Sequence, residues 1–144
     1  MLIGEYNHSI DPKKRLAIPA KLRKELGERA VLARGLDECL FLFPMAEWEK
    51  YTAELLKLPM GKEAARSLNR MMIGGAVEVE FDALGRILIP DNLRHYAGLK
   101  QRAVVMGMNN RLEVWDEEKW QSYRAAAEKN TDMLAEKLGE LGLY

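Results

Sequence analysis

The chain has 144 residues, enough for one good hydrophobic core, and its 31% charged and 48% apolar residues are typical of a soluble globular protein. No apolar run approaches the ~20 residues that a membrane-spanning helix needs, and the N-terminus has no signal-peptide pattern. The single cysteine, Cys39, excludes an internal disulfide framework. We therefore expect a cytoplasmic protein without a membrane partner.

The formal net charge is zero, but the charge is unevenly distributed. Residues 1–35 carry eight basic against four acidic side chains, whereas residues 113–144 carry four basic against eight acidic ones. A basic N-terminal segment can bind a polyanion even when an acidic C-terminal segment brings the net charge of the chain to zero. The same asymmetry also suits head-to-tail packing of subunits.

The first half of the chain predicts strand, turn, strand, short helix, two strands and helix. Asp11 and Pro12 favour the first two positions of a type I turn. Pro19 ends the short strand that follows and suits the start of a helix, which stops at Gly27. Apolar periodicity then predicts strands over 30–33 and 39–43, a helix over 44–58 and a helix over 62–73.

The second half repeats the first. Asp11-Pro-Lys-Lys-Arg15-Leu-Ala-Ile-Pro19-Ala-Lys-Leu22-Arg23 returns, with identical spacing, as Asp82-Ala-Leu-Gly-Arg86-Ile-Leu-Ile-Pro90-Asp-Asn-Leu93-Arg94. With one inserted residue the match continues from Gly35, Leu40, Trp48 and Tyr51 to Gly107, Leu112, Trp120 and Tyr123. Strands are accordingly predicted over 77–81, 103–106 and 111–115, then a helix from about 116. A break at 130–132, with Thr131 or Asp132 as the cap, precedes a last short helix and a loosely held end.

Halves of roughly 50 residues are too short for comfortable independent domains. We therefore predict that they close around one core with pseudo-two-fold symmetry. The predicted divisions are a first repeat over 3–52, a helical connector over 53–73, a second repeat over 74–123 and a helical tail over 124–144.

Each Asp-x-x-x-Arg pair has two interpretations. An ionised Asp11 or Asp82 can accept N–H groups of its own turn while Arg15 or Arg86 bonds the same carboxylate, which would staple the turn. An arginine held in this way still has N–H donors to offer to a phosphate.

The two turns differ in charge. Lys13 and Lys14 precede Arg15, whereas the neutral segment Ala83-Leu84-Gly85 precedes Arg86. A lysine pair can be no more than a solvated turn tip, but Arg23 follows within one strand and one helical turn, which favours a polyanion at the first loop. The predicted DNA-binding residues are Lys13, Lys14, Arg15 and Arg23.

Catalytic patterns are missing from the sequence. The histidines His8 and His95 occupy unmatched positions, and with Cys39 they have no metal-ligand spacing. No phosphate-binding glycine motif is present. The repeated Trp and Tyr residues suit core packing better than base stacking. We predict a protein that is not an enzyme and that binds no metal, cofactor or small-molecule ligand.

Two copies of D-x-x-x-R-[hydrophobic]₃-P, each followed by an L-x-x-W/Y helix segment, resemble the bacterial MraZ family. That family is related to the AbrB/SpoVT group of swapped-hairpin transcription factors, and the resemblance covers roughly residues 3–123. It implies a mainly β, α+β fold: a pseudo-two-fold swapped-hairpin β-barrel of two tandem ββαββ repeats, each followed by a helix.

The resemblance also implies a ring-like homo-oligomer that acts as a cytoplasmic, nucleoid-associated regulator. Such a protein would bind repeated elements of double-stranded promoter DNA upstream of its own cell-division and cell-wall operon and repress it. The DNA-facing loop of the family maps onto Asp11–Arg15. Two alternatives remain: a structural homo-oligomer with no DNA-reading role, and an enzyme that uses Asp11 or Asp82 with a bound metal.

Overall fold

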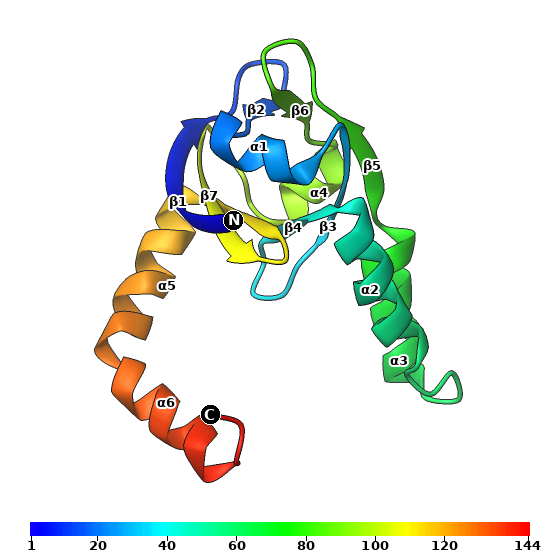
Figure 1. Cartoon of the computed structure of the whole chain (residues 1–144), viewed down its shortest axis with the longest axis vertical. Coiled ribbons are helices and arrows are strands. Elements are labelled where there is room, and N and C mark those ends of the chain that lie inside the picture. The colour runs from blue at the N-terminus through cyan, green and yellow to red at the C-terminus, as the bar shows by residue number, and fades with distance from the viewer.

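The computed structural model describes residues 1–144 as a mixed α+β fold in which each half has the predicted order of elements (Figure 1). The first half comprises β1 (Leu2–Ser9), β2 (Arg15–Ala17), α1 (Ala20–Leu26), β3 (Arg29–Arg34), β4 (Leu40–Pro44), α2 (Met45–Leu56), α3 (Glu63–Asn69) and the π-helical turn η1 (Arg70–Gly74). The second half comprises β5 (Val77–Glu80), β6 (Arg86–Leu88), α4 (Asp91–Tyr96), β7 (Arg102–Asn109), β8 (Leu112–Asp116), α5 (Glu117–Lys129) and α6 (Thr131–Glu140).

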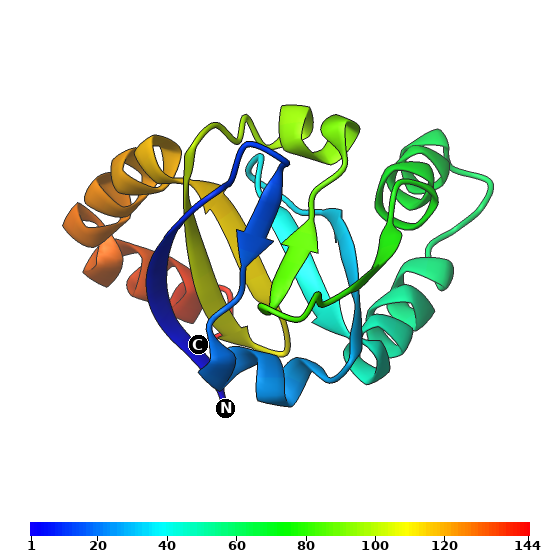
Figure 2. The same cartoon turned by 90° about the horizontal axis from the view of Figure 1, so that it is seen from above.

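The two halves exchange strands. A six-stranded antiparallel sheet has the order β1-β7-β8-β4-β3-β5, so the first strand of each half pairs with the other half. A separate ribbon joins β2 to β6. Figure 2 shows this ribbon at the centre of the molecule, with α1 and α4 on its two sides. Because neither half completes its sheet alone, the duplication forms one α+β unit, which confirms the predicted fold class.

The strand register has the expected pseudo-two-fold symmetry. Leu16 of β2 faces Ile87 of β6, and these are equivalent positions in the two halves. At the centre of the sheet Phe41 of β4 faces Glu113 of β8, again at equivalent positions. The symmetry axis therefore passes through the middle of the ribbon and through the β4–β8 pair.

The main core lies between the sheet, the ribbon and helices α1 and α4. It comprises 20 buried residues, among them Leu16, Leu22, Ile87 and Leu93, each fully inaccessible to solvent. Burying a leucine or isoleucine side chain contributes roughly 1.5–3 kcal/mol. These four residues come from the repeated motifs, so the motifs supply the core beneath the ribbon.

The loops between the repeated strands differ in length, and one predicted match is wrong. Arg34 pairs with Leu40, and Gly107 pairs with Leu112, so Gly107 takes the strand position of Arg34 rather than that of Gly35. β7 begins 11 residues after the first residue of α4, whereas β3 begins 9 residues after the first residue of α1, so the second repeat has two extra residues here. Four residues separate the paired Gly107 and Leu112, whereas five separate the paired Arg34 and Leu40. The two-residue insertion and the one-residue deletion leave a net shift of one residue. This shift aligned Gly107 with Gly35 in the sequence comparison.

Three predicted helix boundaries also need correction. Pro44 belongs to β4, so α2 begins at Met45, and the helix expected over 62–73 changes to π-helical geometry at Arg70. The predicted break between α5 and α6 is confirmed, but Asn130 occupies the N-cap and the Thr131 hydroxyl donates back to the Ala127 carbonyl oxygen.

Helices α2 and α5 pack on the opposite face of the sheet through a second, aromatic cluster. Trp48 and Tyr51 of α2 and Trp120 of α5 pack against its buried members. Tyr123 stacks on Trp120, with ring centroids 5.8 Å apart, and remains 47% exposed. The helices extend from the sheet as two arms, α2–α3 and α5–α6 (Figure 1). No helix of the fold has the length and apolar character needed to cross a membrane.

A candidate nucleic-acid interface on the paired loops

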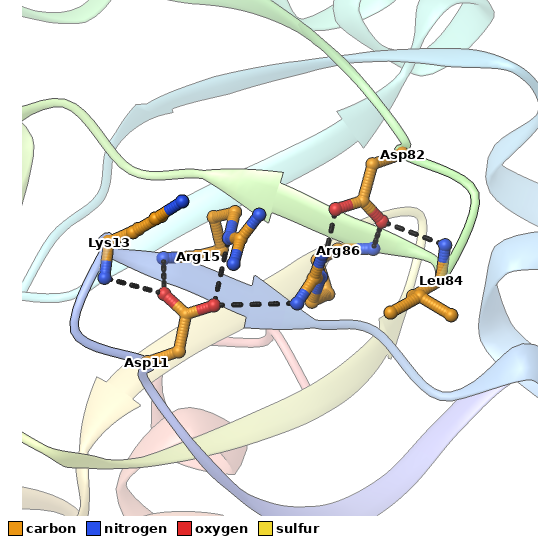
Figure 3. A network of polar contacts seen from close by, with 6 residues as sticks. All are labelled: Asp11, Lys13, Arg15, Asp82, Leu84 and Arg86. Carbon is orange, nitrogen blue, oxygen red and sulfur yellow. Dashed lines mark hydrogen bonds and ion pairs between the residues drawn. The ribbon is translucent and has the colours of Figure 1, made fainter.

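The two Asp-x-x-x-Arg turns have the same hydrogen bonds. Asp11 Oδ1 accepts the N–H groups of Lys13 and Arg15, both at 2.9 Å, and Oδ2 accepts Arg15 Nε at 2.8 Å. Asp82 accepts the N–H groups of Leu84 and Arg86 and the Nε of Arg86 at the same distances (Figure 3). Each aspartate thus closes its turn and orients one guanidinium group.

The residue before each arginine has a left-handed backbone. Lys14 has φ 65° and the equivalent Gly85 has φ 75°. This residue is the fourth of its turn, and its N–H closes the turn by donating to the carbonyl oxygen of Asp11 or Asp82 at 2.9 Å, a position in which glycine is favoured. The first loop therefore places a lysine in a backbone conformation that costs a non-glycine residue about 1 kcal/mol or more.

The two arginines lie on one outward face of the ribbon. Arg15 pairs with Leu88 and Arg86 pairs with Ala17, one position on either side of the buried Leu16–Ile87 pair. Because side chains alternate along a strand, both arginines point away from the core. Arg86 Nη1 also lies 3.6 Å from Asp11 Oδ2, which links the two turns (Figure 3).

Both aspartates remain ionised well into the acid range. The backbone N–H of Arg15 lowers the pKa of Asp11 most strongly, with further lowering from the Arg15 side chain. The backbone N–H and side chain of Arg86 lower the pKa of Asp82 in the same way. Partial burial opposes these effects in both turns. The carboxylates thus position the arginines without consuming the terminal nitrogens of Arg15, which make no hydrogen bond within the chain.

The antiparallel pairing of β2 with β6 brings Arg23 to the second loop, although the sequence grouped it with the cations of the first loop. A methyl group on Gly85 would overlap the guanidinium group of Arg23, so Arg23 lies directly on the second loop. The second loop lacks lysines of its own but receives a cation from α1 of the first repeat. On the two loops and the ribbon between them, the cations Lys13, Lys14, Arg15, Arg23 and Arg86 outnumber the carboxylates Asp11 and Asp82.

A cationic pocket of about 680 Å³ beside the first loop contains residues that the sequence prediction missed. Its basic side chains are Lys14, Arg94, Lys100 and Arg102. The Gln101 carbonyl oxygen accepts the N–H of Ile10 at 2.7 Å, which fastens the longer loop after α4 to the base of the first loop. Arg94 was detectable in principle, because it matches Arg23 in the repeat.

A second polar cluster lies on the symmetry axis within the sheet. Glu113, 8% exposed, accepts Arg111 Nη2 at 2.7 Å and Trp115 Nε1 at 3.0 Å. Burial, followed by the charge of Glu113, raises the pKa of the Cys39 thiol, which disfavours the thiolate form. No three His, Cys, Asp or Glu side chains gather in a group that could hold a metal ion.

The fold and the paired loops define a class: a duplicated, strand-exchanged α+β protein that presents two Asp-x-x-x-Arg turns on one face. Comparison with known proteins identifies the particular family. The family model described as "MraZ protein, putative antitoxin-like" matches residues 1–71 and again residues 72–139. The chain belongs to the MraZ family.

Curated relatives match over nearly their whole length. "Transcriptional regulator MraZ" of Symbiobacterium thermophilum is 50% identical over 137 residues, covering 95% of this chain and 99% of the relative. The protein of the same name from Pelotomaculum thermopropionicum is 48% identical over 143 residues, covering 99% of both chains. The Halothermothrix orenii protein, also of that name, is 46% identical and covers 99% of this chain and 100% of its own.

Proposed function

We propose that this chain is a transcriptional regulator that binds double-stranded promoter DNA through the face formed by the two loops and the ribbon. The observation that carries the proposal is the arrangement of Arg15. Its Nε is held by Asp11 at 2.8 Å, while its terminal nitrogens remain free to donate. A guanidinium group oriented in this way is suited to bidentate bonds with a phosphate or with the edge of guanine.

The roles of the cations differ with their positions. Lys13 and Lys14 at the tip of the first loop, and Arg23 on the second, contact backbone phosphates, which supplies affinity but no sequence information. Arg15 rises from the ribbon between them and reaches a base edge. Arg86, shared by two carboxylates, supports this arrangement and adds positive potential.

A few phosphate contacts per chain give weak, salt-sensitive binding. The logarithm of the binding constant falls with the logarithm of the salt concentration, with a slope of roughly −0.9 per neutralised phosphate. A homo-oligomer that presents several identical faces to repeated promoter elements would raise the apparent affinity by about 10²–10⁴ without any new contact. We therefore include a ring-like homo-oligomer in the proposal. The site of action is the nucleoid, at the chain's own cell-division and cell-wall operon, with repression as the outcome.

The test is a binding titration with DNA from upstream of the chain's own gene, containing the repeats, against a scrambled sequence of equal length. The expected result is preferential binding to the repeats. Arg15→Ala should weaken this binding and relax the preference, whereas Lys13→Ala should weaken binding to both DNAs and keep the preference. Equal or absent binding to both DNAs would favour a structural oligomer without a DNA-reading role. Footprinting on the same DNA then identifies the operator.

A further inference from the structure

We propose that the cationic pocket beside the first loop binds a small molecule that carries a diphosphate group, and that this anion competes with DNA for Lys14. The pocket, of about 680 Å³, lies where the first loop meets helix α4 and the loop that leads into β7, segments that are neighbours in Figure 2. Binding of the anion does not depend on the proposed function, whereas its competition with DNA rests on that function.

Segments far apart in the sequence build the pocket. Ile10, just before the first loop, donates its N–H to the carbonyl oxygen of Gln101 at 2.7 Å, which holds the two loops together. Arg94 of α4 completes the wall, with a side chain that is 13% exposed and an Nη1 that donates to Asp91 at 2.6 Å. The volume lies within the ~300–1,000 Å³ of typical small-molecule sites. The sequence, in which these segments are separate, predicted no small-molecule ligand.

The repeat provides an internal comparison, because an equivalent hollow of about 620 Å³, here called the second hollow, lies at the base of the second loop. In the second hollow Arg29 of β3 faces Glu80 of β5. In the cationic pocket the equivalent pair is Arg102 of β7 and Ser9 of β1. An anion beside Arg29 would therefore meet the charge of Glu80, whereas the strand opposite Arg102 offers only a hydroxyl group.

Two further differences make the pocket more cationic than the second hollow. Glu28 lines the second hollow, whereas the equivalent residue of the pocket is Gln101. Lys100 belongs to the two extra residues of the second repeat and has no counterpart in the first. Four basic side chains and one acidic side chain thus line the pocket, against three and two in the second hollow. A hollow lined by charges of one sign concentrates the opposite charge.

The one acidic residue that lines the pocket already has a counter-charge. Asp11 Oδ1 accepts the N–H groups of Lys13 and Arg15, and Asp11 Oδ2 accepts Arg15 Nε at 2.8 Å. Because Arg15 compensates the charge of Asp11, the basic side chains determine the potential of the pocket.

The basic side chains keep donors for a ligand. Lys14 forms no ion pair within the chain. Arg102 donates only its Nε to Glu117, at 3.1 and 3.2 Å, and its terminal nitrogens make no hydrogen bond. Lys100 Nζ lies 3.8 Å from Glu118, and these side chains are 72% and 84% exposed. Exposed pairs of this kind contribute little stability, so a bound anion replaces Glu118 at small cost.

A diphosphate group matches these donors in charge and geometry. Arginine forms bidentate bonds with phosphate oxygens, and lysine supplies a point charge on a flexible stem. The terminal nitrogens of Arg102 bind one phosphate, while Lys14 and Lys100 neutralise the remaining charge. A single carboxylate would leave most of these cations without a partner. The number of donors therefore favours two linked phosphates over a simple carboxylic acid.

Lys14 connects the pocket to the DNA-binding face, because it belongs both to the pocket and to the first loop. The proposed function assigns Lys14 to a DNA phosphate, and an ammonium group bound to a diphosphate no longer neutralises DNA. The bound anion also places negative charge beside the face that DNA approaches. The small molecule and promoter DNA therefore weaken each other's binding by the same factor.

Isothermal titration calorimetry with inorganic pyrophosphate tests the site in the full chain without DNA. The native chain should bind pyrophosphate at a single site, and sulfate at equal ionic strength should not reproduce the signal. Arg102→Gln should weaken binding by about tenfold or more, because it removes the bidentate donor. The matched control is the equivalent Arg29→Gln, which should bind as the native chain does. No binding to the native chain, or equal losses in the two variants, would overturn the proposal.

A second variant converts the pocket into the likeness of the second hollow. Ser9→Glu/Gln101→Glu introduces the two carboxylates at their equivalent positions, and both residues are exposed, so the fold should be retained. Repulsion between these carboxylates and pyrophosphate should weaken binding by at least about tenfold. Native affinity in this variant would place the anion elsewhere and overturn the proposal.

DNA titrations distinguish a free ligand from a DNA phosphate in the same pocket. Pyrophosphate should weaken promoter binding by the native chain at least about fivefold at constant ionic strength. It should have no such effect on Arg102→Gln. Without pyrophosphate, Lys100→Gln should bind promoter DNA as the native chain does. A loss as large as that in Lys13→Ala would mean that DNA itself fills the pocket, which would overturn the proposal.

The same titrations separate this inference from the proposed function. If pyrophosphate binds while the native chain ignores promoter DNA, the function fails and the anion site stands. If promoter DNA binds while pyrophosphate does not, the anion site fails and the function stands. Binding of both without any mutual effect would overturn the competition for Lys14.

Discussion

Arg86 reaches across the ribbon to Asp11, with Nη1 3.6 Å from Oδ2, whereas Arg15 forms no ion pair with Asp82. The two repeated motifs are therefore equivalent in their turns but not in their arginines. Two carboxylates hold Arg86, and one holds Arg15. This difference separates the roles of the two arginines.

The first prediction concerns the different roles of Arg15 and Arg86. Arg15→Ala should weaken promoter binding by about 1–3 kcal/mol and relax sequence preference, because a base contact is lost. Arg86→Ala should weaken binding less but lower the free energy of unfolding more than Arg15→Ala does, because it leaves two carboxylates without a shared cation. Fluorescence anisotropy and urea unfolding measure the two effects. Equal losses of affinity in both variants would contradict the assignment.

The second prediction is a pH dependence of stability. The pKa values of Asp11 and Asp82 are lowered in the folded state, so these groups bind fewer protons than in the unfolded chain. Their stabilisation is complete above the unfolded-state pKa of about 3.9 and is lost as the pH falls through the folded-state values. Asp11→Asn/Asp82→Asn should be less stable than the native chain at pH 7 and should lose less stability on acidification. Urea midpoints between pH 7 and pH 3 provide the check, and parallel curves would refute it.

The third prediction concerns Lys14 and its left-handed backbone, φ 65°. Lys14→Gly should raise the free energy of unfolding by up to about 1 kcal/mol, because the strain is relieved. It should also reduce the salt slope of DNA binding by about one unit. Lys13→Gly is the matched control, since it removes the same charge from a residue whose φ is not positive. A gain of stability in both variants would argue against a strained Lys14.

The fourth prediction tests the placement of Arg23 on the second loop. Gly85→Ala should destabilise the fold by about 1–3 kcal/mol, because alanine is strained at φ 75° and its methyl group displaces the Arg23 guanidinium group. Part of this loss should disappear in an Arg23→Ala background. A double-mutant cycle without coupling would place Arg23 elsewhere.

Much of the local structure is predictable because it depends on near neighbours. Aspartate, proline and glycine at set spacings select the turns and the short helices after Pro19 and Pro90. The Asp-to-Arg hydrogen bonds span four residues, so the turn itself contains both partners. The lengths of the loops were harder to predict from the sequence. An insertion after α4 and a deletion in the β7–β8 turn align the two repeats in nearly the same way as a single insertion does.

The sequence alone predicted the duplication and the element order, and it offered the stapled turn as one interpretation of each Asp-x-x-x-Arg pair, since each depends on local pattern and short-range chemistry. Tertiary structure decided which half completes which sheet, that Arg23 serves the second loop, and that Arg15 and Arg86 share one face. The physical reasons are the exchange of β1 and β5 between the halves and the pairing of β2 with β6 across them. Pairing partners are chosen by burial and backbone hydrogen bonds over long sequence separations, and the local motifs are compatible with either choice.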